Sequence, residues 1–331
     1  MPAEWERHEG TWLTWPKDPV TWPDRVPQVE KVYLEMIHHL TTHEKVFLLV
    51  DDKATAQKIP KLKNLVVHII PTIDSWIRDY GPNFLVHEKN GGKELAFNHW
   101  EYNAWGGKYE ELIADTKIPQ KIAPLLNCPV FEPGIVLEGG SIEVNGVGTC
   151  LTTKQCLLNK NRNPHLSKKE IEECLKNYLK VRQIIWLEEG IKGDDTDGHI
   201  DDIARFVNAS NVVCAVEEDP ADENYKLLQE NFKILQKSRD QSGERLTVIP
   251  LPMPTPIGEE DGKPLPASYA NFYIANDLVL VPVFQSKKDS NALTIFEKFF
   301  PNRNVVGIPC QDLVWGLGTI HCVTQQQPAC K

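Results

Sequence analysis

The sequence predicts an α/β protein built from several small units of one kind, and three observations support this prediction. Strand-like and helix-like stretches alternate from one end of the 331-residue chain to the other. Many neighbouring strand candidates are separated by short turn signals, which are typical of hairpins. The order hairpin, helix, strand recurs at intervals of roughly 60–70 residues, which indicates repeated architecture. A doubly wound parallel sheet fits so many hairpins less well, and no segment resembles a linker, so we expect one domain over residues 1–331.

The first third of the chain gives clear periodic signals. From Val26 to His43, apolar residues recur at helical spacing and predict a helix with one buried stripe. The apolar runs Val46–Val50 and Leu65–Ile70 predict two buried strands. The other elements expected here are a strand at Thr11–Trp15, a hairpin of Phe84–His87 and Leu95–Phe97 around the turn Asn90–Gly92, and a helix at Glu111–Leu126.

The rest of the chain repeats this pattern. Asn145-Gly146 predicts a tight turn, and Ser167 with Glu170 three positions later predicts the capping box of a helix. The elements expected, in order, are Gly134–Leu137 (strand), Ser141–Val144 with Gly148–Thr152 (hairpin), Gln183–Leu187 (strand), Ile203–Val207 with Val212–Val216 (hairpin), Glu223–Lys237 (helix), Leu246–Pro250 (strand), Tyr269–Ala275 with Leu278–Val283 (hairpin), Asn291–Phe300 (helix), Val305–Ile308 (strand) and Gly318–Thr324 (last strand).

The composition is that of a globular protein and argues against several kinds of partner. The formal net charge is -10 and no long run of Lys or Arg occurs, which argues against a nucleic-acid binder. No stretch approaches the roughly 20 apolar residues of a membrane span, and the N-terminus has no apolar signal core. We therefore expect a cytoplasmic protein without a membrane partner. The acidity suits a cationic small molecule, although it is also ordinary among soluble proteins.

The eight cysteines are scattered and include no Cys-x-x-Cys pair, so zinc-ribbon and thioredoxin-like sites lack support. In a reducing compartment most of them should be free, buried and inert. They are Cys128, Cys150, Cys156, Cys174, Cys214, Cys310, Cys322 and Cys330.

Four segments contain more polar and glycine residues than a scaffold requires. In the first, Arg78 and Asp79 lie between an apolar run and a Gly-Pro break, and alone they would suit a surface turn with an ion pair. In the second, Glu138 follows an apolar run and precedes two glycines, which suits a functional carboxylate or an exposed side chain on a tight turn. The third and fourth segments are residues 193–202 and 316–324.

In the third segment, His199 and Asp201 are two positions apart, so an extended backbone would point both side chains to the same face. The acidic run lacks the ligand order of an EF-hand, and one histidine without a nearby cysteine or second histidine is a poor zinc ligand set. We therefore expect no metal site in this segment.

In the fourth segment, Cys322 follows a Gly-x-Gly approach near the end of the chain. Gly-x-Gly alone is a weak nucleotide-binding signal, and a lone cysteine is more often a buried apolar side chain than a nucleophile. His321 is adjacent, but adjacent residues of a strand face opposite sides, which makes His321 a poor partner base.

Together the four segments supply the groups needed to hydrolyse a guanidinium ion. This planar cation can be bound by two carboxylates through forked hydrogen bonds. A thiolate can attack its central carbon, and a histidine, oriented by a further carboxylate, can protonate the departing ammonia and then deprotonate water. The required groups are present in Asp79, Glu138, His199, Asp201 and Cys322, so the reaction needs no metal and no organic cofactor.

At these positions the chain resembles the agmatine deiminases of the guanidine-modifying (pentein) superfamily and their peptidylarginine-deiminase-like relatives. The resemblance extends along essentially the whole chain, with many motifs in the same order. They are Pro2–Glu6, Thr11–Pro16, Trp76–Pro82, Tyr102–Gly107, Leu137–Ile142, Cys156–Asn159 with Asn161–Pro164, Thr196–Asp201, Ala267–Tyr273 and Ile320–Pro328.

The resemblance implies a five-bladed, pseudo-symmetric α/β-propeller (the pentein fold) and hydrolysis of agmatine to N-carbamoylputrescine and ammonia. It implies that Cys322 forms a covalent amidino intermediate and that His199 is the general acid–base. Glu138 would lie beside His199 and a substrate nitrogen, while Asp79 and Asp201 would hold the guanidinium.

The resemblance also suggests residues for the pocket wall. We expect Trp76 to line the pocket and Asp195, from its position upstream of His199, to lie nearest the distal amine of the substrate. Two departures bear on specificity: Gly316-Leu317-Gly318-Thr319 replaces the usual Gly-Gly-Gly-Asn, and Tyr80 stands where threonine is common. We expect these substitutions to reshape the pocket wall without removing a catalytic group.

Three alternatives stay open at this point. A deiminase of peptidyl or free arginine would need a cation for the α-carboxylate, for which Arg162 or Arg205 is available. An amidinotransferase would use an amine in place of water, and a polyamine binder would need the acidic pocket without the chemistry. The sequence does not decide whether the chain forms a homo-oligomer, or whether its product serves polyamine and putrescine biosynthesis or nitrogen supply.

Overall fold

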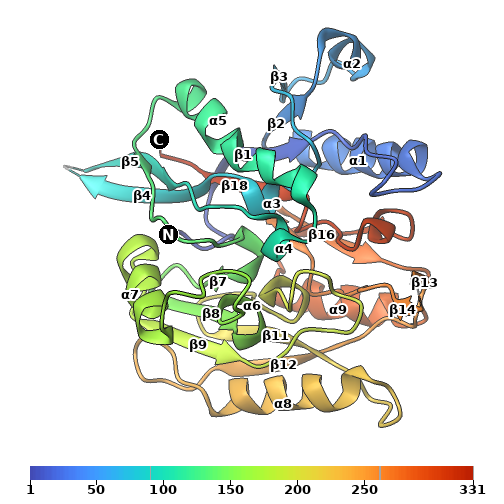
Figure 1. Cartoon of the computed structure of the whole chain (residues 1–331). Helices are drawn as coiled ribbons and strands as arrows, with labels where there is room; N and C mark the ends of the chain where they lie inside the picture. Colours follow the sequence, from blue (N-terminus) through green and yellow to red (C-terminus); the bar gives the residue numbers. More distant parts are fainter. Residues whose placement is uncertain (90, 261, 331) are drawn as a thin grey trace.

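A computed structural model describes residues 1–89, 91–260 and 262–330 of the chain (Figure 1). In this part of the chain the strands are β1 (His8–Thr14), β2 (Lys45–Val50), β3 (Leu65–Ile69), β4 (Asn83–Lys89), β5 (Gly92–Asn98), β6 (Val130–Phe131), β7 (Glu143–Val144), β8 (Thr149–Thr153), β9 (Gln183–Leu187), β10 (Ala204–Phe206), β11 (Asn211–Val216), β12 (Thr247–Pro252), β13 (Glu259–Glu260), β14 (Lys263–Pro264), β15 (Tyr273–Ala275), β16 (Leu278–Val283), β17 (Asn304–Pro309) and β18 (Thr324–Pro328).

The helices lie between these strands and include several single turns. They are α1 (Val26–Thr41), α2 (Lys53–Lys58), α3 (Ile77–Tyr80), α4 (Ala104–Gly107), α5 (Ile118–Leu126), α6 (Lys154–Leu157), α7 (Lys168–Leu179), α8 (Asn224–Lys237) and α9 (Asp289–Phe299), with 3₁₀ helices at Glu110–Lys117, Gly139–Ser141, Ile200–Asp202 and Leu313–Gly316.

One arrangement recurs in all the larger sheets. An antiparallel pair is followed, after a helical segment, by a third strand parallel to the second, as in β4-β5-β6, β7-β8-β9, β10-β11-β12 and β15-β16-β17. The fifth sheet joins the two ends of the chain, because β18 pairs antiparallel with β1, which pairs in parallel with β2. This confirms the α/β class and the recurring order. The placement of the five units as blades around one axis stays a prediction from the resemblance.

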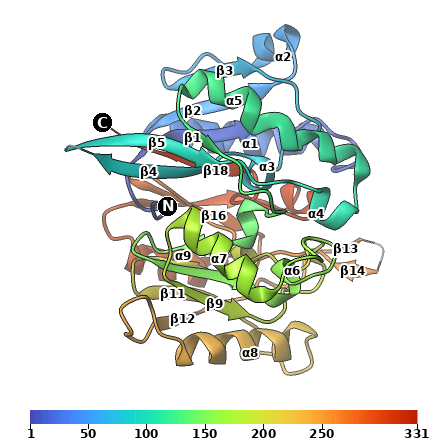
Figure 2. The same cartoon turned by 60° about the vertical axis from the view of Figure 1, so that its left-hand side comes forward.

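The helices pack against these sheets through stripes of buried apolar side chains. In both views α8 packs along β11 and β12 at the lower end of the molecule (Figures 1 and 2). The stripe predicted for α1 is buried, including Val29, Tyr33 and Met36. Ser167 and Glu170 form the predicted capping box at the start of α7. Among the described residues, no helix has the length and apolarity needed to cross a bilayer.

The strand predicted as buried at Leu65–Ile70 is an edge strand instead. As β3 it ends the sheet order β18-β1-β2-β3, so it has a neighbour on one side only. Val66 and Ile69 are 38% and 47% exposed. An apolar run indicates a strand but does not distinguish a central position from an edge position.

Three other predictions need correction where proline, glycine or a turn changes the backbone. The helix predicted at Glu111–Leu126 is a 3₁₀ helix up to Lys117, and α5 starts beside Pro119, whose missing N–H is tolerated in a first turn. Gly134–Leu137 forms no strand, because Gly134 has φ +70° and only Val136 bridges to Glu101.

The third correction concerns Tyr269–Ala275. The strand begins only at Tyr273, since Ser268 Oγ accepts a hydrogen bond from the Ala270 N–H and bends the preceding backbone. The hairpin β4–β5 is confirmed, but Asn90 of its predicted turn lies outside the described residues.

Candidate active site

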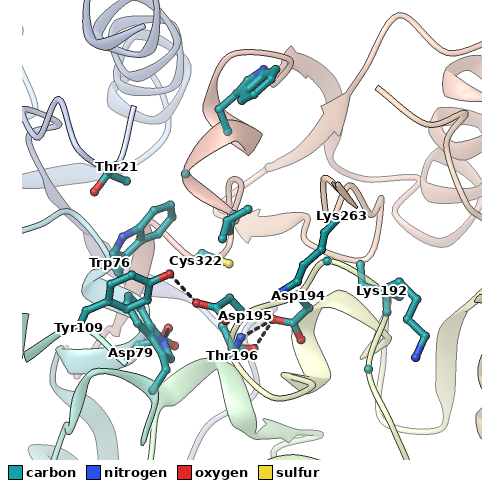
Figure 3. A pocket seen from close by; sticks show the side chains of 18 of the residues that line it. Thr21, Trp76, Asp79, Tyr109, Lys192, Asp194, Asp195, Thr196, Lys263 and Cys322 are labelled. Atoms are coloured by element: carbon teal, nitrogen blue, oxygen red, sulfur yellow. Dashed lines mark hydrogen bonds between the residues drawn. The ribbon is translucent and has the colours of Figure 1, made fainter. Parts of the chain in front are cut away.

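A cavity of about 620 Å³ lies between segments that are far apart in the sequence. Trp76, Asp79, Asp195 and Cys322 point into the same space (Figure 3). Two lysines also line the cavity, Lys192 and Lys263, but acidic side chains are more numerous. They are Asp18, Asp74, Asp79, Glu111, Glu189, Asp194, Asp195 and Glu223.

Cys322 lies in a turn and not in the predicted strand Gly318–Thr324, because β18 begins only at Thr324. Leu317 adopts a left-handed backbone (φ +66°) and turns the chain before the cysteine. The Cys322 thiol is 6% exposed and lines the cavity. Its Sγ accepts a hydrogen bond from Asn271 Nδ2 at 3.1 Å and lies 3.9 Å from Asp201 Oδ2. The sulfur is therefore neither remote from the acidic groups nor sealed in hydrocarbon.

The segment after His199 also departs from the predicted extended backbone, because His199 has φ -57° and ψ 140° but Ile200–Asp202 form a 3₁₀ helix. His199 nevertheless lies beside Asp79 and Asp201 around Gly140. A Cβ atom on Gly140 would lie 2.6 Å from His199 Nδ1, 2.8 Å from Asp79 Oδ1 and 3.1 Å from Asp201 Oδ2. Only glycine leaves room for this convergence.

Three buried polar atoms of the converging residues have no hydrogen-bond partner among the described residues: both ring nitrogens of His199 and Oδ1 of Asp201. The nearest carboxylate oxygens to the imidazole are Asp79 Oδ1 at 3.7 Å and Glu138 Oε2 at 3.9 Å. Buried polar groups are rarely left unpaired. The three atoms therefore indicate a place for a polar ligand.

Glu138 is fully buried, so the alternative of an exposed side chain on a tight turn is wrong. Its Oε1 accepts a hydrogen bond from Arg162 Nε at 2.6 Å, and the Cys156 thiol lies 4.0 Å from Oε2. Arg162 also donates to Asp197 Oδ2 at 2.7 Å and to the Thr196 carbonyl at 2.8 Å. Glu138 is thus tied to the loop that leads to His199.

The surface turn considered for Arg78 and Asp79 is also wrong, since the two residues are 3% and 5% exposed. They do not pair with each other. Arg78 donates to Gln326 Oε1 at 2.8 Å, and Asp79 Oδ2 accepts from Trp105 Nε1 at 2.9 Å. The Trp105 bond leaves Oδ1 of Asp79 facing His199.

The electrostatic environment shifts the pKa values of these groups in different directions. Burial raises the pKa of Asp79 to about 6, although the His199 imidazole opposes this rise. Burial acts in the same direction on Glu138, but Arg162 and His199 outweigh it and hold the Glu138 pKa below its usual value. Burial would lower the pKa of His199, yet Asp79, Cys156 and Glu138 raise it well above the ordinary value. These neighbours therefore favour the protonated imidazolium form of His199.

The thiol and the two adjacent aspartates also differ in charge. Burial and the carboxyl groups of Asp201, Asp202 and Asp79 raise the pKa of Cys322 well above its usual value. Burial and Asp201 raise the pKa of Asp202 in the same way. For Asp201, burial is outweighed by His321, which holds the Asp201 pKa below its usual value. Without a bound cation, Cys322 is thus a thiol beside an ionised Asp201.

The pocket-wall predictions have mixed outcomes. Trp76 lines the cavity, with its Nε1 donating to Asp74 Oδ2 at 2.9 Å. Asp195 lies in the wall, where the Tyr109 hydroxyl donates to it and Lys108 Nζ is 3.4 Å away. Leu317 is also a lining residue.

Tyr80 and Thr319 lie outside the cavity wall. The prediction that Tyr80 reshapes the wall is wrong, because it is buried and its hydroxyl bonds to Thr14 and to the Asp74 carbonyl. Thr319 donates to Asn271 Oδ1 at 2.8 Å and acts on the site only through that amide.

The sequence analysis did not identify Asn271 and Trp105, which hydrogen-bond to residues of the site. Asn271 bonds to the Cys322 sulfur and, at 3.0 Å, to Asp202 Oδ1, while Trp105 holds Asp79. Both residues belong to motifs that carry the resemblance to the agmatine deiminases, and this membership was the only sign that they matter. Nothing in the sequence indicated that an amide and an indole from those motifs would reach the reacting groups.

Two groups of side chains bring potential metal donors within 4.8 Å of one another: Glu138 with Cys156 and His199, and Asp201 with Asp202 and Cys322. Protein groups already compete for these donors. Arg162 places a cation on Glu138, and Asn271 donates to both Asp202 and Cys322. A divalent cation would have to displace these contacts.

The close approach at Gly318 yields a testable prediction. A Cβ atom there would lie 2.7 Å from Trp76 Cζ3 and 3.1 Å from Cys322 Sγ. Gly318→Ala should displace the sulfur and reduce kcat/KM by about 100-fold, as expected for a misplacement near 1 Å. Gly258→Ala is the control, because its Cβ would make only an ordinary 3.4 Å contact with Trp315. Equal kinetics for the two variants would contradict the tight packing.

Comparisons with known proteins give a consistent result. Residues 1–328 match the family model described as Porphyromonas-type peptidyl-arginine deiminase. The chain is 39% identical over 362 positions to an agmatine deiminase of Medicago truncatula, covering 99% of this chain and 96% of that protein. It is 37% identical over 353 positions to an agmatine deiminase of Ectopseudomonas mendocina, covering 99% and 95%. A solved structure of the agmatine deiminase of Enterococcus faecalis superposes with a TM-score of 0.92 at 33% identity, covering 99% of this chain and 95% of that one.

Proposed function

Because this chain belongs to the Porphyromonas-type peptidyl-arginine deiminase family, whose members hydrolyse the C–N bond of a guanidinium group, we propose that it acts on agmatine. The reaction is agmatine plus water to N-carbamoylputrescine plus ammonia. The relatives named as agmatine deiminases, which share up to 39% identity over nearly the full chain among those compared above, support this choice.

One observation carries the proposal: Cys322 and Asp79 line an acidic cavity, His199 and Asp201 lie beside them, and three buried polar atoms of His199 and Asp201 have no hydrogen-bond partner among the described residues. A guanidinium offers N–H donors to Asp201 Oδ1 and to Asp79. Its departing nitrogen would take a proton from His199, whose ring nitrogens are available. The empty hydrogen-bonding positions and the ligand are thus complementary.

The contacts of two arginines favour agmatine over arginine. Arg162, considered for binding an α-carboxylate, is occupied by Glu138, Asp197 and the Thr196 carbonyl. Arg205 is fully buried, does not line the cavity, and donates to Glu143 and Glu4. An α-carboxylate would instead meet a mostly acidic wall, which repels it.

The first half of the proposed mechanism forms the covalent intermediate. Asp79 and Asp201 bind the guanidinium, and its positive charge lowers the free energy of the adjacent Cys322 thiolate, so the thiol releases its proton to solvent as the cation binds. The sulfur attacks the central carbon and forms an S–C bond. The C–N bond then breaks, with the electron pair going to nitrogen and a proton coming from His199, so that ammonia leaves and a thiouronium remains.

In the second half, water is the nucleophile. Neutral His199 takes a proton from water as the oxygen attacks the thiouronium carbon. The S–C bond breaks, the Cys322 sulfur leaves with the electron pair and takes up the remaining hydroxyl proton, and the ureido product forms. Glu138, fixed by Arg162, stabilises the imidazolium in both halves.

We also propose one catalytic domain over residues 1–331, because the site draws on segments from Trp76 to Cys322.

A substrate panel tests this function directly. Ammonia release should be measured with agmatine, free arginine and a peptide with C-terminal arginine at equal concentrations. We expect kcat/KM for agmatine to exceed that for either carboxylate-bearing compound by at least about 100-fold, from the several kcal/mol of like-charge repulsion. A preference for arginine or the peptide would contradict the assignment.

Two further outcomes separate the remaining alternatives. Formation of the ureido product without an added amine excludes an amidinotransferase. A protein that binds agmatine, releases no ammonia and shows no mass increase on the Cys322 peptide would be a polyamine binder.

The pH dependence should show an acid limb set by Asp79. With its pKa raised to about 6 in the free protein, Asp79 is a carboxylate above pH 6 and a neutral acid below it. The neutral form attracts the guanidinium less strongly, so kcat/KM should fall tenfold per pH unit well below pH 6. Asp79→Asn should have a lower kcat/KM and lack this limb. An unchanged limb in that variant would assign the titration to another group.

A further inference from the structure

A second histidine lies in the acidic cluster and is not used by the mechanism above. His321 directly precedes Cys322 and is 1% exposed. Its Nδ1 is 2.7 Å from Asp201 Oδ2, and its Nε2 is 2.9 Å from Glu4 Oε2. Because ionised carboxylates only accept hydrogen bonds, both ring nitrogens donate and the ring carries a positive charge. Neither nitrogen is free to receive the Cys322 proton.

Glu4 is held firmly on the other side of this imidazole, although it belongs to the first few residues of the chain. Its Oε1 accepts from Arg205 Nη2 at 2.9 Å and from the Ile274 N–H at 2.8 Å. Arg78 Nη2 lies 3.5 Å from Oε2. Burial would raise the pKa of Glu4, but Arg205, His321 and Arg78 outweigh it and hold the pKa below its usual value. Glu4 is therefore a fixed anion.

The backbone of His321 is fixed as well. Its N–H donates to Asn271 Oδ1 at 2.9 Å and to the Asn271 carbonyl at 3.1 Å. Since Asn271 also bonds to the Cys322 sulfur, the imidazole and the sulfur share one support. The position of the imidazole then decides which way Asp201 faces: Oδ2 is bound by His321, and Oδ1 is left without a partner among the described residues.

We propose that His321 is a positioning residue of this active site: held by Glu4, it orients Asp201 toward the guanidinium and makes the N-terminal residue Glu4 part of the site's support. The inference rests on the proposed function only for the identity of the cation. His321 also places a positive charge beside Asp201, near the sulfur that Asp79 and Asp202 face as well. Removing that charge raises the free energy of the thiolate.

The chain offers a matched control for this pair. His8 is likewise buried and pairs with a buried glutamate, Glu44, at 3.3 Å. Its Nε2 lies 2.7 Å from the Glu4 carbonyl, so it belongs to the same part of the core without contacting Asp201 or Cys322. His321→Gln and Glu4→Gln can therefore be compared with His8→Gln and Glu44→Gln.

The test measures agmatine turnover and alkylation of Cys322 by iodoacetamide against pH, in the full chain. We expect His321→Gln to lower kcat/KM by about 100-fold, mainly through KM, and Glu4→Gln to lower it by about tenfold through loss of a charge-assisted bond. The double variant should be no worse than about threefold below His321→Gln, because both changes disrupt one unit. His8→Gln and Glu44→Gln should keep kcat/KM within about threefold of the parent while reducing thermal stability.

The pH at which alkylation of Cys322 is half-maximal is a second measurement, and it would not change if His321 had only a structural role. The midpoint for Cys322 should rise by about one pH unit in His321→Gln and stay unchanged in His8→Gln. If His321→Gln kinetics and alkylation equal those of His8→Gln, the positioning role is refuted. Should His321→Gln fail to fold, Glu4→Gln decides alone through its KM relative to Glu44→Gln. If the parent releases no ammonia from agmatine, the proposed function fails, whereas the alkylation comparison still tests the role of His321.

Discussion

Cys322→Ser should abolish turnover while leaving the fold intact. Neither neighbouring imidazole is placed to take the proton of a serine hydroxyl, because the raised pKa of His199 favours its protonated form and both nitrogens of His321 bond to carboxylates. It is also a far weaker nucleophile than a thiolate, so we expect kcat to fall by at least about 10⁴-fold. Ammonia release measures this loss, and mass spectrometry of the parent during turnover should show the amidino adduct on the peptide that contains Cys322.

The control is another thiol of the same chain. Cys174 is half-buried in α7, and burial raises its pKa to about 11. Cys174→Ser should retain kcat within about twofold, as expected for a change remote from the chemistry. Substantial turnover by Cys322→Ser, or an adduct found on a different cysteine, would reject the proposed nucleophile.

The fold was predictable where periodicity and turn chemistry agreed. α1, the hairpin β4–β5 and the capping box of α7 each follow from a local pattern of a few residues, and each is present. The failures share a different cause. Whether Leu65–Ile70 lies at an edge depends on which strands surround it, and the turn at residues 317–323 depends on packing of Gly318 against Trp76. Neither contact is encoded nearby in the sequence.

The site shows the same division between local and long-range information. Residue types suggested Asp79, Glu138, His199, Asp201 and Cys322 because their chemistry is complementary to a guanidinium, and the structure brings them to one place. The arguments from local geometry failed, since neither His199–Asp201 nor His321–Cys322 is extended.

The same division explains the contacts that were missed. Asn271 and Trp105 act through hydrogen bonds to residues 51 and 26 positions away. Such bonds are set by tertiary structure, so a single sequence does not reveal them.

The buried charges of the site form two series of contacts that meet at the proposed substrate position. One runs from the loop Thr196–Asp197 through Arg162 to Glu138 and His199; the other runs from Glu4 through His321 to Asp201. Each ends in an atom left for the ligand. Removing a charge at either end should therefore weaken substrate binding strongly, because the other charges of that series stay buried without a balancing partner.

Asp201→Asn is the sharpest case of this imbalance. The change removes the anion that we propose binds the guanidinium, and it leaves His321 with Glu4 as its only carboxylate partner among the described residues. Breaking a buried charge pair costs about 2–5 kcal/mol, which corresponds to a loss of about 30- to 4,000-fold in kcat/KM for agmatine. Steady-state kinetics should place most of the loss in KM, and guanidinium-containing inhibitors should weaken in parallel.

Asp202→Asn is the matched control, since it changes the neighbouring residue in the same way. Burial and Asp201 raise the pKa of Asp202 well above its usual value, which favours its neutral form. Asparagine keeps a neutral carbonyl oxygen for the bond from Asn271 Nδ2. We therefore expect kcat/KM within about tenfold of the parent, far above Asp201→Asn. Equal losses in the two variants would mean that charge at position 201 is not what holds the substrate.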